Sequence, residues 1–488
     1  MTGNADQTDQ TDQTDQTDQT DQTDQTDQAG PAEPATGDEL LQMLLDDAGQ
    51  RADPFAVFDR LRAEAPVHRT RLGGAWLLSR HADCAAALRD PRLGKGETSA
   101  HDLASIVGAA PVPEVMRSGS LVHMNPPDHT RLRGLVNRAF TPPRVAAMRA
   151  GMEAAVDQLL LDAASEHTSA GGATPFDLLD ALAFPMPVQV IGDLVGVPRS
   201  DQPEFRGWVR DQALAFEPGA GAHVMAAAGR GAREMAAYFA GLVRERRRAP
   251  ADDLVSALLE VRDERGAGLT KQELVAIPVL LFGAGFETTM NLIGNALARL
   301  LWEPGVRDAL APGAPGADPP GGERPAGERP GVDRPGVDRR VASLASFIDE
   351  VLRFDSPVQI DARVALEPAA IGEVSAGGVV VEPGEWVVAL LGAANRDPAA
   401  YGPTAHRFDP GRFDGPDVTP GVLSFSAGIH HCLGAPLARL EGAVAVERLL
   451  AFEARHGCGF EPVHEAPRWR STLTSRGLES LPVAVATT

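Results

Sequence analysis

The chain has 488 residues, of which 43% are hydrophobic and 23% charged, so it carries enough apolar material for a large buried core and is neither wholly disordered nor fibrous. Its formal net charge of −22 repels phosphates and anionic headgroups, which argues against nucleic acid and membrane surfaces as partners. The three cysteines, Cys84, Cys432 and Cys458, lie far apart, so neither a disulfide framework nor a four-thiolate metal site is expected.

Two segments of low complexity set the predicted domain boundaries. Residues 1–36 contain Asp-Gln-Thr repeats that offer no apolar side chain to bury, and we expect a disordered tail there. Residues 312–340 are rich in proline and glycine, which predicts a flexible insertion. Residues 37–488 are therefore predicted to form a single domain.

The longest apolar run, Leu274 to Phe286, is too short to span a bilayer, and no basic and apolar leader begins the chain. We expect a cytoplasmic protein without a membrane anchor.

Apolar periodicity predicts mostly helices. In chain order, the predicted helices are Phe55 to Ala65 (with Asp53 as N-cap and Pro54 as first helical residue), Asp128 to Phe140, Pro143 to Ser165, Pro187 to Val195, His223 to Arg246, Val341 to Phe354 and Ala435 to Phe452. The predicted strands are Val67 to Leu72, Ala75 to Leu78, Gly378 to Val381 and Trp386 to Leu391, too few for a dominant sheet. The expected fold class is mainly α with small β-sheets (α+β).

One further helix is predicted to cross the whole domain. Thr270 and Glu273 form a capping box, and the apolar pattern that follows lasts for roughly 30 residues, or about 45 Å. Its middle, Gly283 to Thr289, places small residues, a carboxylate and two hydroxyls inside an apolar stretch, which helix propensity and burial both disfavour. Such local conflicts often mark functional sites.

Cys432 lies just before the predicted helix that starts at Ala435. A thiolate there would face unpaired amides and the positive end of the helix dipole. Glycines nearby would let the backbone approach a flat ligand. A lone cysteine is more often an inert buried thiol, so the surrounding pattern has to decide.

That pattern is Phe-x-x-Gly-x-His-x-Cys-x-Gly, matched by Phe425, Gly428, His430, Cys432 and Gly434. Other motifs accompany it in the expected order: His129 to Arg133 after Asn125-Pro126-Pro127, Ala284 to Thr289, Glu350-x-x-Arg353, and Phe408 to Phe413. Each is weak alone, because Glu-x-x-Arg pairs are common on helices, but the ordered set is specific. The chain resembles the cytochrome P-450 superfamily, most closely its bacterial members that tailor natural products.

The resemblance implies a long central helix over a haem b group (iron protoporphyrin IX), with Cys432 as the iron ligand. A thiolate ligand favours cleavage of the O–O bond. The haem propionates would be bound by His129, Arg133, Arg363 and His430. The remaining implied cofactor contacts are Phe425, Gly428, Gly434, Ala284 and Gly285.

The resemblance also implies roles around the haem. Thr288 would donate a hydrogen bond to dioxygen while Glu287 relays protons. Glu350, Arg353 and Arg412 would form a buried ionic network beneath the haem.

The activity implied is that of a monooxygenase. It would hydroxylate or epoxidise a bulky hydrophobic molecule, such as a macrolide, another polyketide or a terpenoid, with dioxygen. The chain has no flavin or nicotinamide fingerprint, so a ferredoxin and a flavin-dependent ferredoxin reductase are the expected electron donors, with Arg439 in the docking patch. We expect a monomer.

Three alternatives stay open at this point. A haem-binding protein of the same fold without turnover would not need the Glu287-Thr288 pair. A zinc site at His430, His431 and Cys432 is disfavoured because adjacent donors do not readily converge on one ion. A nucleotide loop at 283–285 lacks the last glycine and the preceding strand.

Overall fold

The computed structural model describes residues 36–96, 120–169, 175–215, 221–310, 343–372, 378–415 and 420–487. By its internal contacts the chain from Thr36 to Thr488 forms one compact unit. The predicted tail, apart from Thr36, and the predicted insertion at 312–340 lie outside the described residues.

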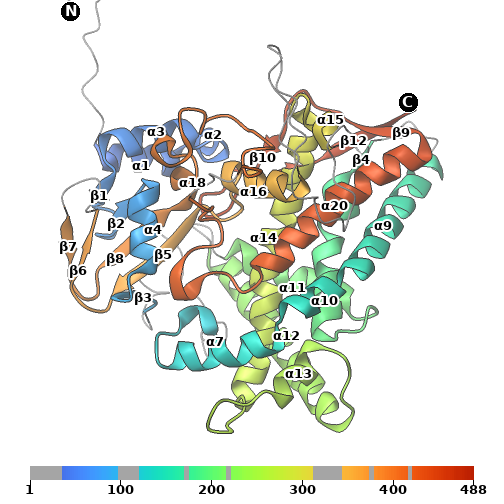
Figure 1. Cartoon of the computed structure of the whole chain (residues 1–488), viewed down its shortest axis with the longest axis horizontal. Coiled ribbons are helices and arrows are strands. Elements are labelled where there is room, and N and C mark those ends of the chain that lie inside the picture. The colour runs from blue at the N-terminus through green and yellow to red at the C-terminus, as the bar shows by residue number, and fades with distance from the viewer. Residues whose placement is uncertain are drawn as a thin grey trace, which may run out of the picture. The chain divides into compact units, whose positions relative to one another are not determined.

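Helices account for most of the described chain (Figure 1), which confirms the predicted fold class. They are α1 (Gly37–Asp46), α2 (Ala48–Ala52), α3 (Phe55–Glu64), α4 (His81–Arg89), α7 (Asp128–Ala139), α8 (Pro142–Ala147), α9 (Arg149–Ser169), α10 (Pro185–Val195), α11 (Gln202–Leu214), α12 (Ala222–Arg248), α13 (Leu254–Glu260), α14 (Lys271–Trp302), α15 (Val306–Leu310), α16 (Leu344–Phe354), α18 (Leu391–Ala394), α19 (Pro398–Tyr401) and α20 (Ala435–His456). Short 3₁₀ turns lie at Leu121–His123 and Gly428–His430, and a π turn at Leu179–Ala183.

Within the described residues, the strands form four small sheets. They are β1 (Val67–Arg69), β2 (Trp76–Leu78), β3 (Leu93–Gly94), β4 (Phe176–Asp177), β5 (Ile360–Ala365), β6 (Ala369–Ile371), β7 (Val379–Val381), β8 (Trp386–Leu390), β9 (Cys458–Pro462), β10 (Arg468–Trp469), β11 (Leu478–Ser480) and β12 (Pro482–Thr487). The largest sheet has the order β1-β2-β8-β5-β3, with only β2 and β8 parallel. In Figure 1 this sheet lies beside α4, away from the bundle around α14.

The predicted helices and strands occur at their expected places, with two corrections. The helix predicted from Pro143 to Ser165 is two helices, since α8 ends at Ala147, with Met148 as its C-cap, before α9 begins at Arg149. The predicted N-cap at Asp53 is wrong: Pro54 is the N-cap of α3, and no side chain bonds there. Asp53 instead ends α2, where its N–H donates to the carbonyl of Gly49.

The central helix α14 begins with the predicted capping box, in which Thr270 and Glu273 each bond the other's backbone N–H. It is 32 residues long and packs against α10, α12, α16 and α20. Among the described residues it is the one helix long and apolar enough to cross a membrane by length and composition. Its buried residues, among them Leu292 and Ile293, pack within the core that those neighbouring helices share.

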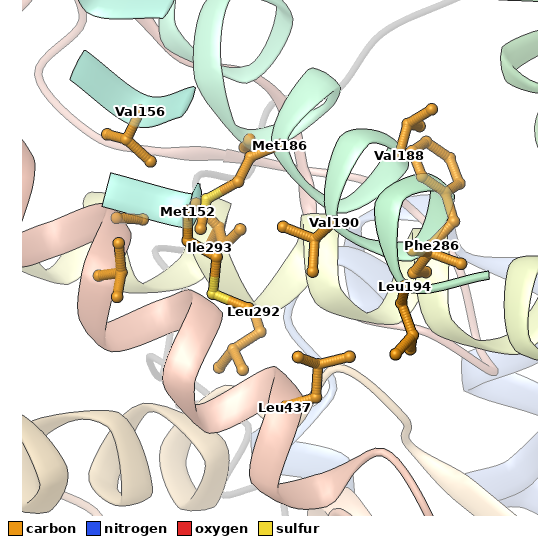
Figure 2. Close-up of a cluster of buried hydrophobic side chains, with 14 of the residues drawn as sticks. Met152, Val156, Met186, Val188, Val190, Leu194, Phe286, Leu292, Ile293 and Leu437 are labelled. Atoms are coloured by element: carbon orange, nitrogen blue, oxygen red, sulfur yellow. The ribbon is translucent and has the colours of Figure 1, made fainter. Parts of the chain in front are cut away.

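The main core surrounds the second half of α14. Figure 2 shows Leu292 and Ile293 of α14 among Met186 and Val190 of α10 and Leu437 of α20. Close packing of such side chains allows few alternative positions for a helix. The core thus fixes α14 between α10 and α20 and with it the turn of α14 that carries Thr288.

Candidate active site

A cavity of about 420 Å³ opens between α14, α10, the segment 357–361 and the start of α20. Its walls are mainly apolar, and Ile191, Leu194, Leu280 and Leu292 are among them. Nine of the predicted site residues line it: His129, Arg133, Ala284, Gly285, Thr288, Phe425, His430, Cys432 and Gly434. Glu287, Arg363 and Gly428 are not among the lining residues.

The loop before α20 presents Cys432 to this cavity. The N–H of Cys432 donates to the carbonyl of Phe425 at 2.9 Å, which closes the loop. Gly428 has φ +73°, and a Cβ atom there would lie 2.5 Å from the carbonyl oxygen of Leu88. The close approach of α4 therefore requires a glycine at this position.

The Cys432 side chain is exposed toward the cavity, within the protein. Burial raises the pKa of this thiol, while bonds from the N–H groups of Gly434 and Ala435 and the charge of Arg133 act in the opposite direction. The predicted amides at the start of α20 do face the sulfur, but they do not outweigh burial. A metal ion coordinated by this sulfur would deprotonate the thiol.

One end of the cavity collects nitrogen donors. The rings of His129 and His430 are 4.4 Å apart, and Arg363 is only 1% exposed. Within the described chain, the Nε2 atoms of both histidines and Nε of Arg363 are buried without a hydrogen-bond partner. Buried polar atoms normally have partners, so these three are matched to an acceptor that the described residues do not supply. Two propionate groups are such acceptors, and the residues therefore fit haem.

This end is also electrostatically positive. Lys95 donates to Asp361 at 2.7 Å, and Arg363 donates to the same carboxylate at 2.5 Å. Although burial would raise it, these two cations hold the pKa of Asp361 well below its usual range. Burial, followed by the charges of Arg363 and Lys95, lowers the pKa of His430 to about 3. The uncompensated cationic character suits two carboxylates.

The wall of the cavity formed by α14 combines two small residues with the hydroxyl of Thr288. Ala284 and Gly285 place little bulk there, and a Cβ on Gly285 would lie 2.9 Å from Cδ1 of Ile191. The Thr288 hydroxyl donates to the carbonyl of Ala284 at 2.9 Å, and its two lone pairs remain accessible to the cavity. Glu287 points to another side of α14 and pairs with Arg470 at 3.2 Å.

The structure adds Glu441 to the site, which the sequence analysis missed. It lines the cavity, is 1% exposed, and its Oε2 has no partner among the described residues. Burial raises the pKa of Glu441 to about 8, so the carboxyl is protonated at neutral pH. A signal existed in the sequence, because this glutamate lies on the same face of its helix as Leu437 and Val444.

The predicted ionic network is confirmed. Arg353 donates to both oxygens of Glu350 at 2.7 and 2.8 Å, and Arg412 donates to the same carboxylate at 3.1 Å. Glu350 and Arg353 are fully buried. Arg439, predicted for a docking patch, pairs with Asp349 at 2.7 Å and lies 4.6 Å over the ring of Phe425.

Comparison with known proteins identifies the family to which the chain belongs. The family model described as cytochrome P-450 matches residues 340–459. The chain is 37% identical to vitamin D(3) 25-hydroxylase of Pseudonocardia autotrophica, over 89% of this chain and 94% of that protein. The chain belongs to the cytochrome P-450 family.

Other members confirm the assignment. The chain is 34% identical to 6-deoxyerythronolide B hydroxylase of Saccharopolyspora erythraea, over 90% of this chain and 98% of that protein. It is equally identical to mycinamicin IV hydroxylase/epoxidase of Micromonospora griseorubida, over 87% and 94%. The solved structure of PksS, a cytochrome P-450 of the Bacillus subtilis 168 bacillaene polyketide synthase, aligns with a TM-score of 0.69 at 28% identity, covering 91% of this chain and 99% of PksS.

The chain is therefore a monooxygenase with a haem-thiolate cofactor, as the sequence resemblance implied. The zinc interpretation finds no support in the described ranges, where no three His, Cys, Asp or Glu side chains are grouped to hold a metal ion.

Proposed function

We propose that the protein binds haem b through Cys432 and hydroxylates or epoxidises a macrolide or a related bulky polyketide. The observation that carries this proposal is the cavity, which is lined by an amide-bonded cysteine sulfur, by Ala284, Gly285 and Thr288, and by two histidines whose Nε2 atoms have no partner among the described residues. The names of two relatives give 6-deoxyerythronolide B and mycinamicin IV as their substrates. The mainly apolar walls suit such molecules, and a terpenoid is the second choice.

Bound haem supplies the activation of dioxygen and the insertion of one oxygen atom into a C–H or C=C bond. The residues of the chain would bind the haem propionates and deliver protons into the cavity. His129, Arg133, Arg363 and His430 would hold the propionates. Unpartnered nitrogens of His129, Arg363 and His430 support this role, and Arg133 lines the same cavity. The Thr288 hydroxyl would turn from the Ala284 carbonyl to donate into the cavity. Glu287 would restore that proton from solvent, to which its side chain is 20% exposed.

The surroundings of the enzyme follow from the same proposal. Electrons would come from a ferredoxin and a flavin-dependent ferredoxin reductase, as for bacterial members of this type. We place the protein in the cytoplasm as a monomer, because its cysteine usage and acidic charge fit that compartment.

The test is spectroscopic. The purified chain is expected to be red, and its reduced carbon monoxide adduct is expected to show the far-shifted Soret band of thiolate-ligated haem. Cys432→His should abolish that band. Addition of 6-deoxyerythronolide B should shift the iron from low to high spin, whereas a shift with terpenoids alone would move the substrate to that class. A histidine-type spectrum from the unaltered chain would reject the proposal.

A further inference from the structure

Arg470 bridges one turn of the central helix beside the cavity. Its Nη1 donates to Oε1 of Glu287 at 3.2 Å, and its Nη2 donates to Oδ1 of Asn291, four residues further along α14. Asn291 is 2% exposed, while Arg470 and Glu287 are 26% and 20% exposed at the side chain. The guanidinium fork thus joins an acid at the edge of solvent to a buried amide.

The chain makes specific room for this fork. Gly477, the residue before β11, has so little space that a Cβ there would lie 2.1 Å from Oδ1 of Asn291 and 2.5 Å from Nη2 of Arg470. The N–H of Arg470 donates to the carbonyl of Gly477 at 2.9 Å, which fixes the start of the side chain. The backbone of Arg470 and both ends of its guanidinium group are thus bonded. Because the guanidinium is planar and rigid, it loses little conformational entropy for each hydrogen bond that it forms.

The hairpin that carries Arg470 is tied to a wall of the cavity. The N–H of Gln359 donates to the carbonyl of Thr474 at 2.9 Å, and Val358 forms a bridge with Ser475. Val358 itself lines the cavity. Arg470 is therefore fixed to the wall of the active site as well as to α14.

Glu287 needs such a holder if it works as a relay. Thr288 lines the cavity, but its neighbour Glu287 lies about 100° further round the helix and does not. A free glutamate side chain samples several rotamers, and proton transfer requires hydrogen-bond geometry. We propose that Arg470 is a positioning residue: it holds the Glu287 carboxylate at the site from which protons pass toward Thr288. This inference rests on the function proposed above.

The test uses the full haem-loaded chain with NADPH, a plant ferredoxin and its reductase, in the presence of 6-deoxyerythronolide B. Arg470→Gln is expected to slow NADPH consumption by about threefold or more and to raise its solvent deuterium isotope effect, because proton delivery becomes limiting. Arg470→Lys, which keeps the charge but not the fork, should recover part of the rate. Arg468→Gln, at an exposed arginine two residues before Arg470, is the matched control and should behave as the unaltered chain.

A double-substitution cycle separates positioning from a structural role. In a Glu287→Gln background, Arg470→Gln should cause no further slowing, since the group it positions is gone. An equal slowing in that background, or an unaltered rate in Arg470→Gln itself, would overturn the inference. Gly477→Ala, which displaces the fork without removing it, should mimic Arg470→Gln and serves if that variant folds poorly. Failure of the proposed function is distinct, because the unaltered chain would then lack the thiolate carbon monoxide band.

Discussion

At the scale of single residues, the Thr288 hydroxyl has a choice of acceptors. It now donates to the Ala284 carbonyl within its own helix, and it also lines the cavity. Thr288→Ala removes the proton donor without adding bulk, so reduced oxygen should leave as hydrogen peroxide while NADPH consumption continues. The measurement is peroxide formed per NADPH, with Thr288→Ser as the control that keeps the hydroxyl. Unchanged coupling of NADPH to product in Thr288→Ala would remove this residue from the mechanism.

Glu441 gives a residue-scale prediction about stability. Its pKa is raised by burial to about 8 in the fold, against 4.5 as the ordinary value. The folded protein therefore binds a proton that the unfolded chain releases, so the stabilisation is complete below the ordinary pKa and is lost as pH rises through the folded pKa. Glu441→Gln abolishes this dependence. As pH rises from about 5 to about 8, the free energy of unfolding of the variant should increase by on the order of 3 kcal/mol relative to that of the unaltered chain.

Denaturant unfolding of both proteins at a series of pH values measures the effect. Glu64→Gln, a change at a partly exposed residue that pairs with Arg60, serves as control. Its free energy of unfolding should differ from that of the unaltered chain by the same amount at every pH in this range. If the difference in the free energy of unfolding is also independent of pH for Glu441→Gln, the Glu441 carboxyl is ionised in the folded protein.

At the scale of elements, α16 is joined to the loop before α20 by buried charges. Arg353 bonds Glu350 and also donates to the carbonyls of Asn395, Ala405 and Arg407. Arg353→Met would leave Glu350 buried without its main counter-charge, at a cost of about 3–5 kcal/mol. Arg60→Met, at a partly exposed pair within one helix, should cost less than about 1 kcal/mol. Urea unfolding measures both, and equal costs would contradict the assigned role.

The sequence predicts elements well where the signal is local. The capping box of α14 and the start of α20 at Ala435 are local patterns, and both are confirmed. Strand β5 was missed because Asp361 and Arg363 interrupt its apolar pattern. Those charges are tolerated there because Lys95 and Ser426 bond them.

The site residues likewise divide into those that local sequence patterns predict and those that only the fold brings together. Motif spacing and family resemblance located nine of the residues that line the cavity, including Cys432 and Thr288. They did not locate Lys95 or Arg470, because each acquires its role from a partner at least 180 residues away in the chain. Such pairings are created by the fold, and no local pattern encodes them.

At the scale of the whole molecule, Asp355 connects distant parts of the chain. This fully buried carboxylate accepts from Arg299 of α14 at 2.6 Å and from Arg476 of the C-terminal hairpin at 2.8 Å. Arg396, before α19, approaches it at 3.5 Å. The central helix, the hairpin and the segment before the cysteine loop therefore share one negative charge.

Sharing that charge makes the fold sensitive to acid. Burial alone would raise the pKa of Asp355, but Arg299 and Arg476 hold it well below the usual range. A carboxyl with a depressed folded pKa stabilises the fold above its unfolded pKa, and this stabilisation is lost as pH falls from about 4 toward the folded value. The free energy of unfolding, measured with urea, should fall steeply below about pH 4 in the unaltered chain. In Asp355→Asn it should be lower at neutral pH, because Arg299, Arg396 and Arg476 lose a buried carboxylate partner, and should decline less steeply in acid. An acid decline of the same slope in both proteins would show that other carboxylates, such as Asp361, carry the sensitivity.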